Sequence, residues 1–575
     1  MGAVAHAIAL VLLVVLAPGV ASAVRPSHSR SGGGDDVATY RAASIVYTPS
    51  GSKAWPPEDY LDFNLGRIAT HVVNASAAGA QIVVLPETVF WEAGLQNARD
   101  APDSGSAHAA MRQYGLTLPD PELVEANPCV GGADPNAVNG AFLAALSCLA
   151  REEHIVLVAN VIEAAGSDTQ PLRQGGKNFN AIVVFDHQGT IIGKYRKHHV
   201  FGTSYAIDQP PPMGHIAKPF STHFGVQFGA IVCFDMEAFE PANTWLSSGV
   251  ENFVFSSAWV NSFPVIYATQ VQLGFAISTQ SNLIASNIGG PVDRSGSGIY
   301  TKGTVLAEDR PGQSNEEEAK TGKVLIADVP KHPQRPWHGM VGMMGPEKEL
   351  RVPPPLWLAD SLSPPVTPSR AGPRPEPWDP SAATPCDVSI GGSMVGTAAC
   401  LPFENMEHEE DTNSLYANVS FGDITCEFSL EGALNIDYGS NPVVAVFSSP
   451  VKFPYTPSHL TIQFCIALPC KTFPDCRPEN SGPDDSRNFN DTVGTFTSVS
   501  VKATTKSPTS RTVPILGSYE GGGLAALPAK FEHYHNRLLD EFVYIMDHDT
   551  TGLGAIAVYN AGIYSTTFEV ESESL

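Results

Sequence analysis

The sequence predicts an α/β domain followed by a smaller β-rich domain. From residue 39 to 345, apolar runs typical of buried strands alternate with longer amphipathic stretches. Residues 346–385 are rich in proline and indicate an extended connector without a core of its own. From 386 to 575 the segments are short, alternate polar and apolar residues, and hold six of the nine cysteines. This pattern is typical of a β domain stabilised by disulfides.

The elements of the first domain can be placed from their hydrophobic periodicity. Helices are expected at 60–78, where apolar residues recur at helical spacing, and at 141–151. Strands are expected at 42–47, 81–86, 155–161, 180–185, 190–195, 228–232 and 252–256. The turn sequence Asp186-His-Gln-Gly189 predicts a hairpin between two of these strands. Since both hairpins and helix-separated strands occur, the sheet should be mixed.

The N-terminus has the features of a signal peptide. An apolar core from Ala7 to Ala17 is followed by Ala21-Ser-Ala23, a small-x-small cleavage site, so residues 1–23 should be removed. A signal anchor is the alternative, and it would need a longer apolar stretch. No later segment is long enough to span a membrane, and the acidic C-terminal tail argues against a lipid anchor. The mature protein is expected to be secreted and extracellular.

Charge and sequons agree with that expectation. The formal net charge of −25 argues against nucleic acid or an anionic membrane as a partner, because both favour basic surfaces. Three sequons begin at Asn74, Asn418 and Asn490 and are candidate N-glycosylation sites.

In an oxidising compartment the odd number of cysteines is informative. Cys129 and Cys148 flank a helix-like stretch and are expected to pair with each other. The six cysteines after residue 385 allow fifteen connectivities, which the sequence does not distinguish. These eight leave Cys233 without a partner. An unpaired thiol at the end of the apolar run 228–232, where a strand is expected to turn into a helix, is a candidate nucleophile.

Two other segments supply what a catalytic thiol needs. Glu87 ends an apolar strand and could carry protons, and Lys197 could stabilise the charge that develops on a carbonyl oxygen. The backbone N–H of Phe234 could share that second role. Each residue alone has an ordinary explanation: a helix-capping carboxylate, a solvated lysine or an inert core thiol. Together they indicate a thiol amidase acting on a small-molecule amide.

Three separated segments then resemble, in the same order, the motif regions of a known superfamily. They are Leu85-Pro-Glu87, Tyr195-Arg-Lys197-His-His-Val-Phe201 and Val232-Cys233-Phe-Asp235. These segments are similar to those of the nitrilase superfamily, whose members use a Glu-Lys-Cys triad. The segments 240–242, 258–261, 282–288 and 295–300 resemble its vanin/biotinidase branch specifically. The similarity is strong from 45 to 329 and loose after 386.

The resemblance implies a four-layer αββα sandwich followed by a vanin-type C-terminal β domain. It implies that Glu87 is the general base and acid, Lys197 the oxyanion-side cation, and Cys233 the nucleophile that forms a thioester. The implied reaction hydrolyses pantetheine to pantothenate and cysteamine, with biocytin or another biotinyl amide as the alternative. The family uses no metal or organic cofactor.

One departure from the family pattern supports a rival hypothesis. Related enzymes commonly carry a second glutamate in the loop after the lysine, whereas residues 202–208 contain only one acid, Asp208. A non-catalytic member that kept the fold for binding is therefore the rival, and a general nitrilase is a third alternative. Trp259 could line the substrate pocket or be an ordinary packed tryptophan. On a strand, His198 and His199 would point to opposite faces, which is poor metal-ligand geometry.

Overall fold

The computed structural model describes most of the two predicted domains. In the first it covers residues 38–333, with gaps at 132–138, 167–175, 212–217, 263–265, 291–293 and 314–315. In the second it covers 383–569, with gaps at 392–393, 410–412, 432–441, 453–455, 457–458, 471–472, 477–493, 507–510, 521–522, 528, 537–540, 550–555 and 559. The predicted signal peptide, nearly all of the predicted connector, and the Asn490 sequon lie outside the described residues.

The first sheet of the N-terminal domain is mixed, as the sequence predicted. In spatial order its strands are β13 (Lys323–Pro330), β1 (Thr39–Val46), β2 (Ile82–Val84), β4 (Val156–Ala165), β5 (Lys177–Phe185) and β6 (Ile191–Arg196), and β3 (Gly115–Leu116) also pairs with β4. Strands β1, β2 and β4 are parallel, whereas β5, β6 and β13 join antiparallel. The hairpin between β5 and β6 is the one predicted at residues 186–189.

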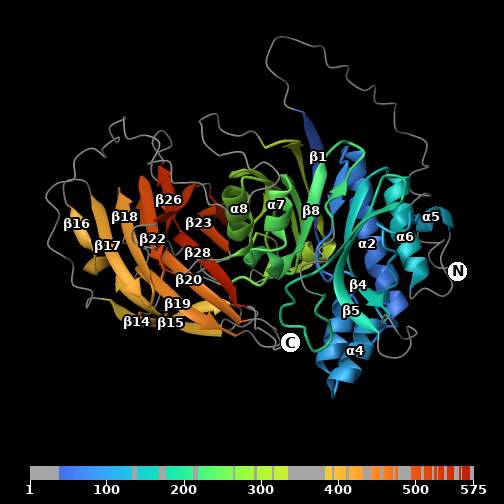
Figure 1. The fold of residues 1–575 in the computed structure, drawn as a ribbon, viewed down its shortest axis with the longest axis horizontal. Helices are drawn as coiled ribbons and strands as arrows, with labels where there is room; N and C mark the ends of the chain where they lie inside the picture. The colour runs from blue at the N-terminus through green and yellow to red at the C-terminus, as the bar shows by residue number, and fades with distance from the viewer. Residues whose placement is uncertain are drawn as a thin grey trace, which may run out of the picture.

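A second sheet lies against the first (Figure 1). Its strands, in spatial order, are β12 (Thr304–Asp309), β11 (Ser297–Thr301), β10 (Asn282–Asn287), β9 (Asn252–Ser257), β8 (Gln227–Val232) and β7 (Phe220–Ser221). The central strands β8, β9 and β10 are parallel, and antiparallel strands close both edges. The sequence had indicated β8 and β9 within this group.

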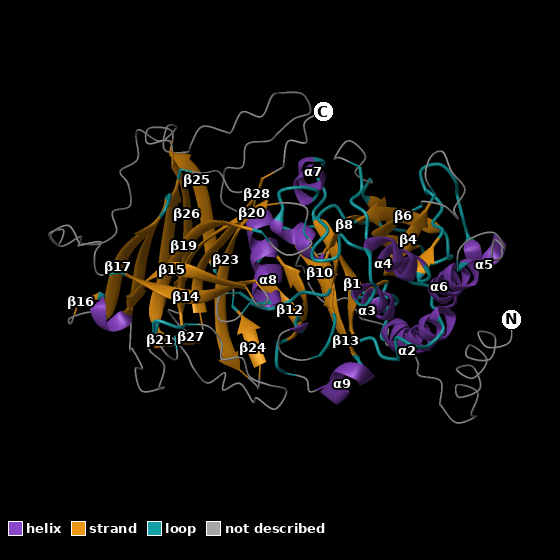
Figure 2. Ribbon diagram, turned by 90° about the horizontal axis from the view of Figure 1, so that it is seen from below, coloured by secondary structure: helices purple, strands orange, loops and turns teal. Residues whose placement is uncertain are grey.

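Alternating side chains bury both faces of the first sheet. In β2, Ile82 and Val84 pack in the cluster shared with the second sheet, while Val83 between them packs with the helices. The helices on that outer face are α2 (Pro57–Ala77), α3 (Glu92–Arg99), α4 (Ser104–Arg112) and α6 (Gly140–Glu152). Helices α7 (Ala242–Ser247) and α8 (Ala268–Thr279) cover the second sheet (Figure 2). The domain is therefore the four-layer αββα sandwich that the resemblance implied.

Helix α2 forms because its apolar residues share one face. Leu61, Leu65, Ile68 and Val72 are buried at spacings of three or four residues. A proline in the first turn and two acidic residues, Glu58 and Asp59, favour its N-terminus. Two short helices, α5 (Pro128–Gly131) and α9 (Glu316–Thr321), complete the described helices of this domain.

The C-terminal region is an antiparallel β sandwich. One sheet has the order β14 (Thr384–Gly391), β15 (Met394–Pro402), β19 (Val443–Val451), β20 (His459–Leu468), β28 (Asn560–Glu569), β23 (Arg511–Glu520) and β24 (Gly523–Ala526). The facing sheet has the order β16 (Glu407–Glu409), β17 (Ser414–Phe421), β18 (Ile424–Glu431), β22 (Ser498–Thr505), β26 (Glu541–Asp549) and β25 (Lys530–Asn536). Strands β21 (Gly494–Phe496) and β27 (Ile556–Val558) form a separate pair.

The two domains share a continuous apolar core. The outer face of the β23-containing sheet packs on α8, so that Val513 and Phe275 belong to one cluster. At the closest point a Cβ on Gly274 would lie 2.7 Å from the carbonyl oxygen of Pro514, so only glycine allows this approach. Figures 1 and 2 both show α8 between the β sandwich and the second sheet.

The disulfides agree with the counting made from sequence. Cys129 bonds Cys148, which confirms that prediction, although Cys148 lies within α6 rather than beyond it. The remaining pairs are Cys386–Cys400, Cys426–Cys465 and Cys470–Cys476. The Cys426–Cys465 bond joins β18 to β20 and so links the two sheets of the sandwich. Cys233 is free and buried, as expected.

Candidate active site

The three predicted site residues follow the ends of three strands. Glu87 lies beyond β2, Lys197 directly follows β6, and Cys233 directly follows β8. The N–H of Glu87 donates to the carbonyl of Ser257 at the end of β9, which ties the end of the first sheet to the second. The structure thereby brings residues 87, 197 and 233 to one buried region between the sheets.

Glu87 and Lys197 form a buried ion pair. Lys197 Nζ lies 2.8 Å from Glu87 Oε1, and both residues are at most 5% exposed. The same oxygen accepts a hydrogen bond from Asn180 Nδ2 at 2.7 Å. The other carboxylate oxygen accepts the N–H of Ala258 at 2.9 Å. Three donors therefore fix both oxygens of the carboxylate.

A chain of buried amides supports Glu87 from behind. Asn180 Oδ1 accepts from Asn160 Nδ2 at 2.7 Å, and Asn160 Oδ1 accepts from the indole N–H of Trp91 at 2.9 Å. Asn160 Oδ1 also accepts the backbone N–H of Thr88. The sequence analysis did not identify these residues. Their signal was an asparagine in each of two otherwise apolar strands, since a buried amide must find partners.

Cys233 occupies an unusual backbone conformation. It begins a short 3₁₀ helix, η2 (Cys233–Glu237), and has φ of +45°. Thr88, next to Glu87, has φ of +67°. Positive φ is strained for residues with a Cβ and concentrates at functional sites. The sequence had predicted the change from strand to helix at Cys233, and the structure confirms it.

The surroundings of Cys233 favour the neutral thiol. Burial raises the pKa of Cys233 to about 12, the charge of Glu87 adds to that rise, and Lys197 opposes it. Burial alone would lower the pKa of Lys197. The negative charge of Glu87, with that of Asp235, outweighs burial and raises the pKa of the ammonium. The resting site thus holds a thiol, a carboxylate and an ammonium within electrostatic reach of one another.

Asp235 joins the segment that carries Lys197 to the turn that carries Cys233. Its Oδ2 accepts from the Tyr195 hydroxyl at 2.8 Å and from the Val232 N–H at 3.0 Å. Its Oδ1 accepts the N–H groups of His198 at 3.1 Å and His199 at 2.7 Å. Burial raises the pKa of Asp235 to about 6, and Lys197 with these donors limits the rise. Asp235 lay inside a quoted motif, but sequence reasoning gave it no role.

The structure also locates the two adjacent histidines and the acid in the loop after Lys197. His198 and His199 lie in the loop after β6, so the expectation that they sit on a strand was wrong. Asp208, the single acid of the loop after Lys197, accepts from His108 and from the Asn178 N–H, both at 2.7 Å. Its observed contacts thus tie this loop to α4 and β5.

The residues predicted to contact the substrate both lie beside the ion pair and the thiol. Phe234 follows Cys233 in η2, and its ring packs on Phe201. Trp259 follows Ala258, is buried, and donates its backbone N–H to Asn287. The Trp259 indole N–H has no hydrogen-bond partner among the described residues. Roles for Phe234 in the oxyanion hole and for Trp259 in substrate binding stay predictions.

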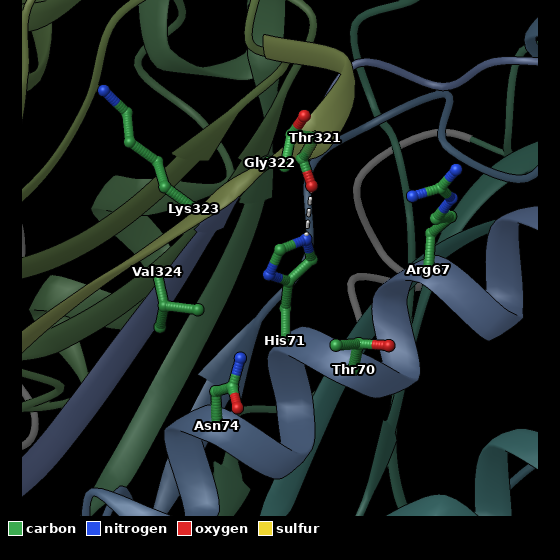
Figure 3. Close-up of a pocket in the computed structure, with 8 residues that line it drawn as sticks. All are labelled: Arg67, Thr70, His71, Asn74, Thr321, Gly322, Lys323 and Val324. Atoms are coloured by element: carbon green, nitrogen blue, oxygen red, sulfur yellow. Dashed lines mark hydrogen bonds between the residues drawn. The ribbon is translucent and has the colours of Figure 1, made fainter. Parts of the chain in front are cut away.

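Two sequons can be located, and both asparagines are exposed. Asn74 lies on α2 and Asn418 on β17. Asn74 also lines a pocket between α2 and the start of β13 that contains none of the three candidate residues (Figure 3). Within that pocket His71 Nε2 lies 2.9 Å from the carbonyl of Thr321. The pocket residues are Arg67, Thr70, His71, Asn74, Thr321, Gly322, Lys323 and Val324.

Metal-ligand and membrane-spanning features can be assessed for the described part of the chain. There, one group has the spacing of metal ligands, namely Cys386, Cys400 and Cys476. Each of these sulfurs is already in a disulfide, so the group does not offer thiolates. Among the described helices, none combines the length and apolar character needed to cross a lipid bilayer.

Comparison with known proteins finds a family match within the first domain. Residues 41–281 match the model of the carbon-nitrogen hydrolase family. The chain is 33% identical over 279 residues to biotinidase from Takifugu rubripes, covering 47% of this chain and 51% of that protein. It is 33% identical over 273 residues to vanin-like protein 1 from Drosophila melanogaster, covering 45% and 43%. It is 31% identical over 285 residues to pantetheinase from Canis lupus familiaris, covering 48% and 50%.

The match thus spans about half the length of these curated relatives. Among solved structures, the chain resembles Nit3 from Saccharomyces cerevisiae, a member of branch 10 of the nitrilase superfamily. That likeness has 18% identity and a TM-score of 0.37, and covers 51% of this chain and 90% of Nit3. By the family match, residues 41–281 form a carbon-nitrogen hydrolase domain. Its curated relatives are biotinidases, vanin-like proteins and pantetheinases.

Proposed function

We propose that the protein is an amidohydrolase that cleaves a linear small-molecule amide through a thioester on Cys233. The observation that supports this most directly is the buried Glu87–Lys197 ion pair beside the single unpaired cysteine. A buried ion pair is costly to maintain unless the site uses it or its geometry is well satisfied. The names of two relatives of this chain, biotinidase and pantetheinase, agree with hydrolysis of a vitamin amide.

The chemistry follows from the resting protonation states. At neutral pH the Cys233 thiol is protonated, because burial and Glu87 raise its pKa to about 12. Glu87 takes the thiol proton as sulfur attacks the carbonyl carbon, and the Lys197 ammonium with the Phe234 N–H stabilises the oxyanion. The C–N bond breaks, and Glu87 gives its proton to the leaving amine. Water then attacks the thioester with Glu87 again as base, which releases the acid and restores the thiol.

The mechanism is tested by intact-protein mass spectrometry during turnover. Wild-type protein mixed with a candidate amide should show a mass increase equal to the acyl group, and Cys233→Ala should show neither the adduct nor turnover. Lys194→Met is the control variant, because Lys194 lies on β6 three residues before Lys197 but pairs with Glu163 rather than Glu87. Retained turnover in Cys233→Ala would contradict the mechanism.

For the substrate we propose pantetheine, cleaved to pantothenate and cysteamine, ahead of biocytin or another biotinyl amide. The similarity supports both classes, since pantetheinase and biotinidase are matched at 31% and 33% identity. A fluorogenic pantothenate amide and a biotinyl amide, assayed side by side, distinguish them. We expect the larger kcat/KM for the pantothenate amide, and a larger value for the biotinyl amide would reverse the assignment.

A second candidate function is binding without catalysis. It is favoured by the absence of a glutamate from residues 202–208, where Asp208 contacts His108 instead. Iodoacetamide separates the two candidates. A non-catalytic protein would bind pantetheine while Cys233 resisted alkylation at every pH up to 10.

We also propose that the mature protein is secreted, beginning after Ala23, and N-glycosylated. Four disulfides and two exposed sequon asparagines, Asn74 and Asn418, support this. Mass spectrometry of protein collected from the medium of expressing cells tests it. The N-terminal peptide should begin at Val24, and glycosidase treatment should lower the mass. Protein retained in the cells with residues 1–23 intact would contradict it.

A further inference from the structure

The C-terminal domain contacts the turn that carries the candidate nucleophile. Helix η2 starts at Cys233 and ends at Glu237, and its last carbonyls have no later helical turn to donate to them. The carbonyl of Glu237 accepts from the hydroxyl of Thr566. The next two carbonyls, of Ala238 and Phe239, accept from Arg511 Nη2 at 3.1 and 3.4 Å. Three successive carbonyls after the nucleophile are thus held by side chains of the other domain.

Arg511 and Thr566 are placed together by strand register. They face each other as partners on the antiparallel strands β23 and β28. The guanidinium of Arg511 also stacks on Phe275 of α8, with Cζ 5.1 Å from the ring centre. Thr566 is buried, and its hydroxyl donates to the Glu237 carbonyl. One rigid sheet therefore aims both donors at the same turn.

Charge reinforces this contact. Glu237 is buried, which raises the pKa of its carboxyl to about 8, and the Thr566 hydroxyl and then the charge of Arg511 limit that rise. Burial lowers the pKa of Arg511 to about 10, so it remains a cation at neutral pH. A cation is also favourable beside the carbonyl end of a helix. Loss of Arg511 would leave the Ala238 carbonyl without this donor and the Phe239 carbonyl with only the N–H of Asn243.

A second contact reaches the segment that carries Lys197. The N–H of Gly202, five residues after Lys197, donates to Thr456 Oγ1 of the C-terminal domain at 3.1 Å. Thr456 is buried. The same domain therefore touches the segments that carry the ammonium and the thiol, which Asp235 joins to each other.

We propose that Arg511, with Thr566, is a positioning residue that holds Cys233 in register with Glu87 and Lys197. The C-terminal domain is then part of the catalytic apparatus rather than an appended module. This inference rests on the proposed amidase function for its kinetic consequence, but the position of the thiol can be measured without any substrate. A displacement of about 1 Å at a reacting atom can cost about a hundredfold in rate.

The test compares four variants in the full-length protein. Arg511→Met removes the single Nη2 group that donates to both carbonyls, and Arg511→Lys keeps the charge but loses the planar guanidinium. Thr566→Val removes one hydroxyl at nearly constant volume. Lys502→Met is the matched control, since Lys502 is a cation of the same domain that pairs with Glu427 on β18.

We expect Arg511→Met to lower kcat about tenfold to a hundredfold with KM within about twofold of the wild-type value. The rate of Cys233 alkylation by iodoacetamide should fall as well, because the thiolate loses its alignment with Lys197. Arg511→Lys should restore part of both rates, and Lys502→Met should match the wild type. Thermal unfolding of every variant shows whether the fold is intact.

The outcomes separate this inference from the proposed function. If the wild type hydrolyses no amide, the alkylation rates still decide whether Arg511 positions the thiol. If Arg511→Met does not fold, Thr566→Val is the variant that tests the inference. For Thr566→Val we expect kcat and the alkylation rate each to fall about threefold to tenfold, which corresponds to the loss of one buried hydrogen bond. The inference would be overturned if Arg511→Met folds and its kcat and alkylation rate equal those of Lys502→Met. If Arg511→Met does not fold, the same result for Thr566→Val would overturn it.

Discussion

At the scale of single residues, the Cys233 thiol is neutral in the resting protein and therefore a weak nucleophile. Cys233 is buried beside a carboxylate, and both effects raise the pKa of its thiol. The thiolate must therefore form during attack rather than before it. That order suits a protein with four disulfides, because a standing thiolate would exchange with them.

The alkylation rate of Cys233 should report this electrostatic setting. With a pKa of about 12, the rate should rise about tenfold per pH unit from 7 to 10, as the thiolate fraction does. Glu87→Gln removes a like charge and should raise the rate at pH 8 about tenfold, while Lys197→Met should lower it. Lys194→Met should leave it unchanged. A plateau near pH 8.5 in the wild type would contradict the burial argument.

The amide chain behind Glu87 gives a second residue-scale prediction. Asn180→Leu removes the donor to Glu87 Oε1 and the acceptor for Asn160, so kcat should fall about tenfold to a hundredfold. KM should change little, because Asn180 lies behind the carboxylate. Asn97→Leu is the control, since Asn97 is an amide on α3 that bonds the carbonyl of Lys53 near the surface. Equal kcat values for Asn180→Leu and Asn97→Leu would exclude a catalytic role for the hydrogen-bonded amides behind Glu87.

Sequence reasoning located the reacting residues but not their support. Glu87 and Cys233 could be found because each follows an apolar strand and has reactive chemistry, whereas Lys197 was identified by the resemblance of its segment to a family motif. Asn160 and Asn180 could not be paired from sequence. Their contact depends on the register of β4 with β5, where Asn160 faces Ile182 and Asn180 faces Ile162. A register of this kind is set by the whole hairpin and its turn.

At the scale of elements, the turn after β8 depends on one carboxylate. Asp235→Asn replaces one accepting oxygen by an NH₂ group. Depending on the amide orientation, this removes the acceptor of the Tyr195 hydroxyl and the Val232 N–H, or that of the His198 and His199 N–H groups. We expect a loss of about 2–4 kcal/mol in the free energy of unfolding. Tyr195→Phe removes the hydroxyl that donates to Asp235, while the His198 N–H keeps Asp235 as an acceptor, so it should cost about 1 kcal/mol. Chemical denaturation measures both, and equal values would contradict the bridging role of Asp235.

Several elements matched their sequence-based positions, and the reasons differ. Helix 60–78 was found within three residues of α2 because its periodicity is strong. Strands β10 to β13 were not predicted individually, since their short apolar runs lie among polar residues. The three disulfides of the second domain could not be predicted either. Cys426 and Cys465 come together only when two sheets face each other.

At the scale of the whole molecule, stability should depend on the close approach of α8 and β23. Gly274→Ala places a Cβ 2.7 Å from a backbone oxygen that cannot rotate away, so we expect a loss of about 1–3 kcal/mol. Gly66→Ala is the control, because that position in α2 has open space around it. It should be neutral or stabilise by up to about 1 kcal/mol. Both can be measured by thermal unfolding, and similar values would contradict tight packing at the domain boundary.

The pairing of β1 with β13 has a consequence for synthesis. Thr39 pairs with Pro330, so the outer strand of the first sheet arrives almost three hundred residues after its neighbour. Until then β1 presents an open edge of unpaired N–H and C=O groups, a template for joining other chains. A nascent chain released near residue 300 would keep that edge open. Premature termination there should therefore yield aggregates, even though Glu87, Lys197 and Cys233 would all be present.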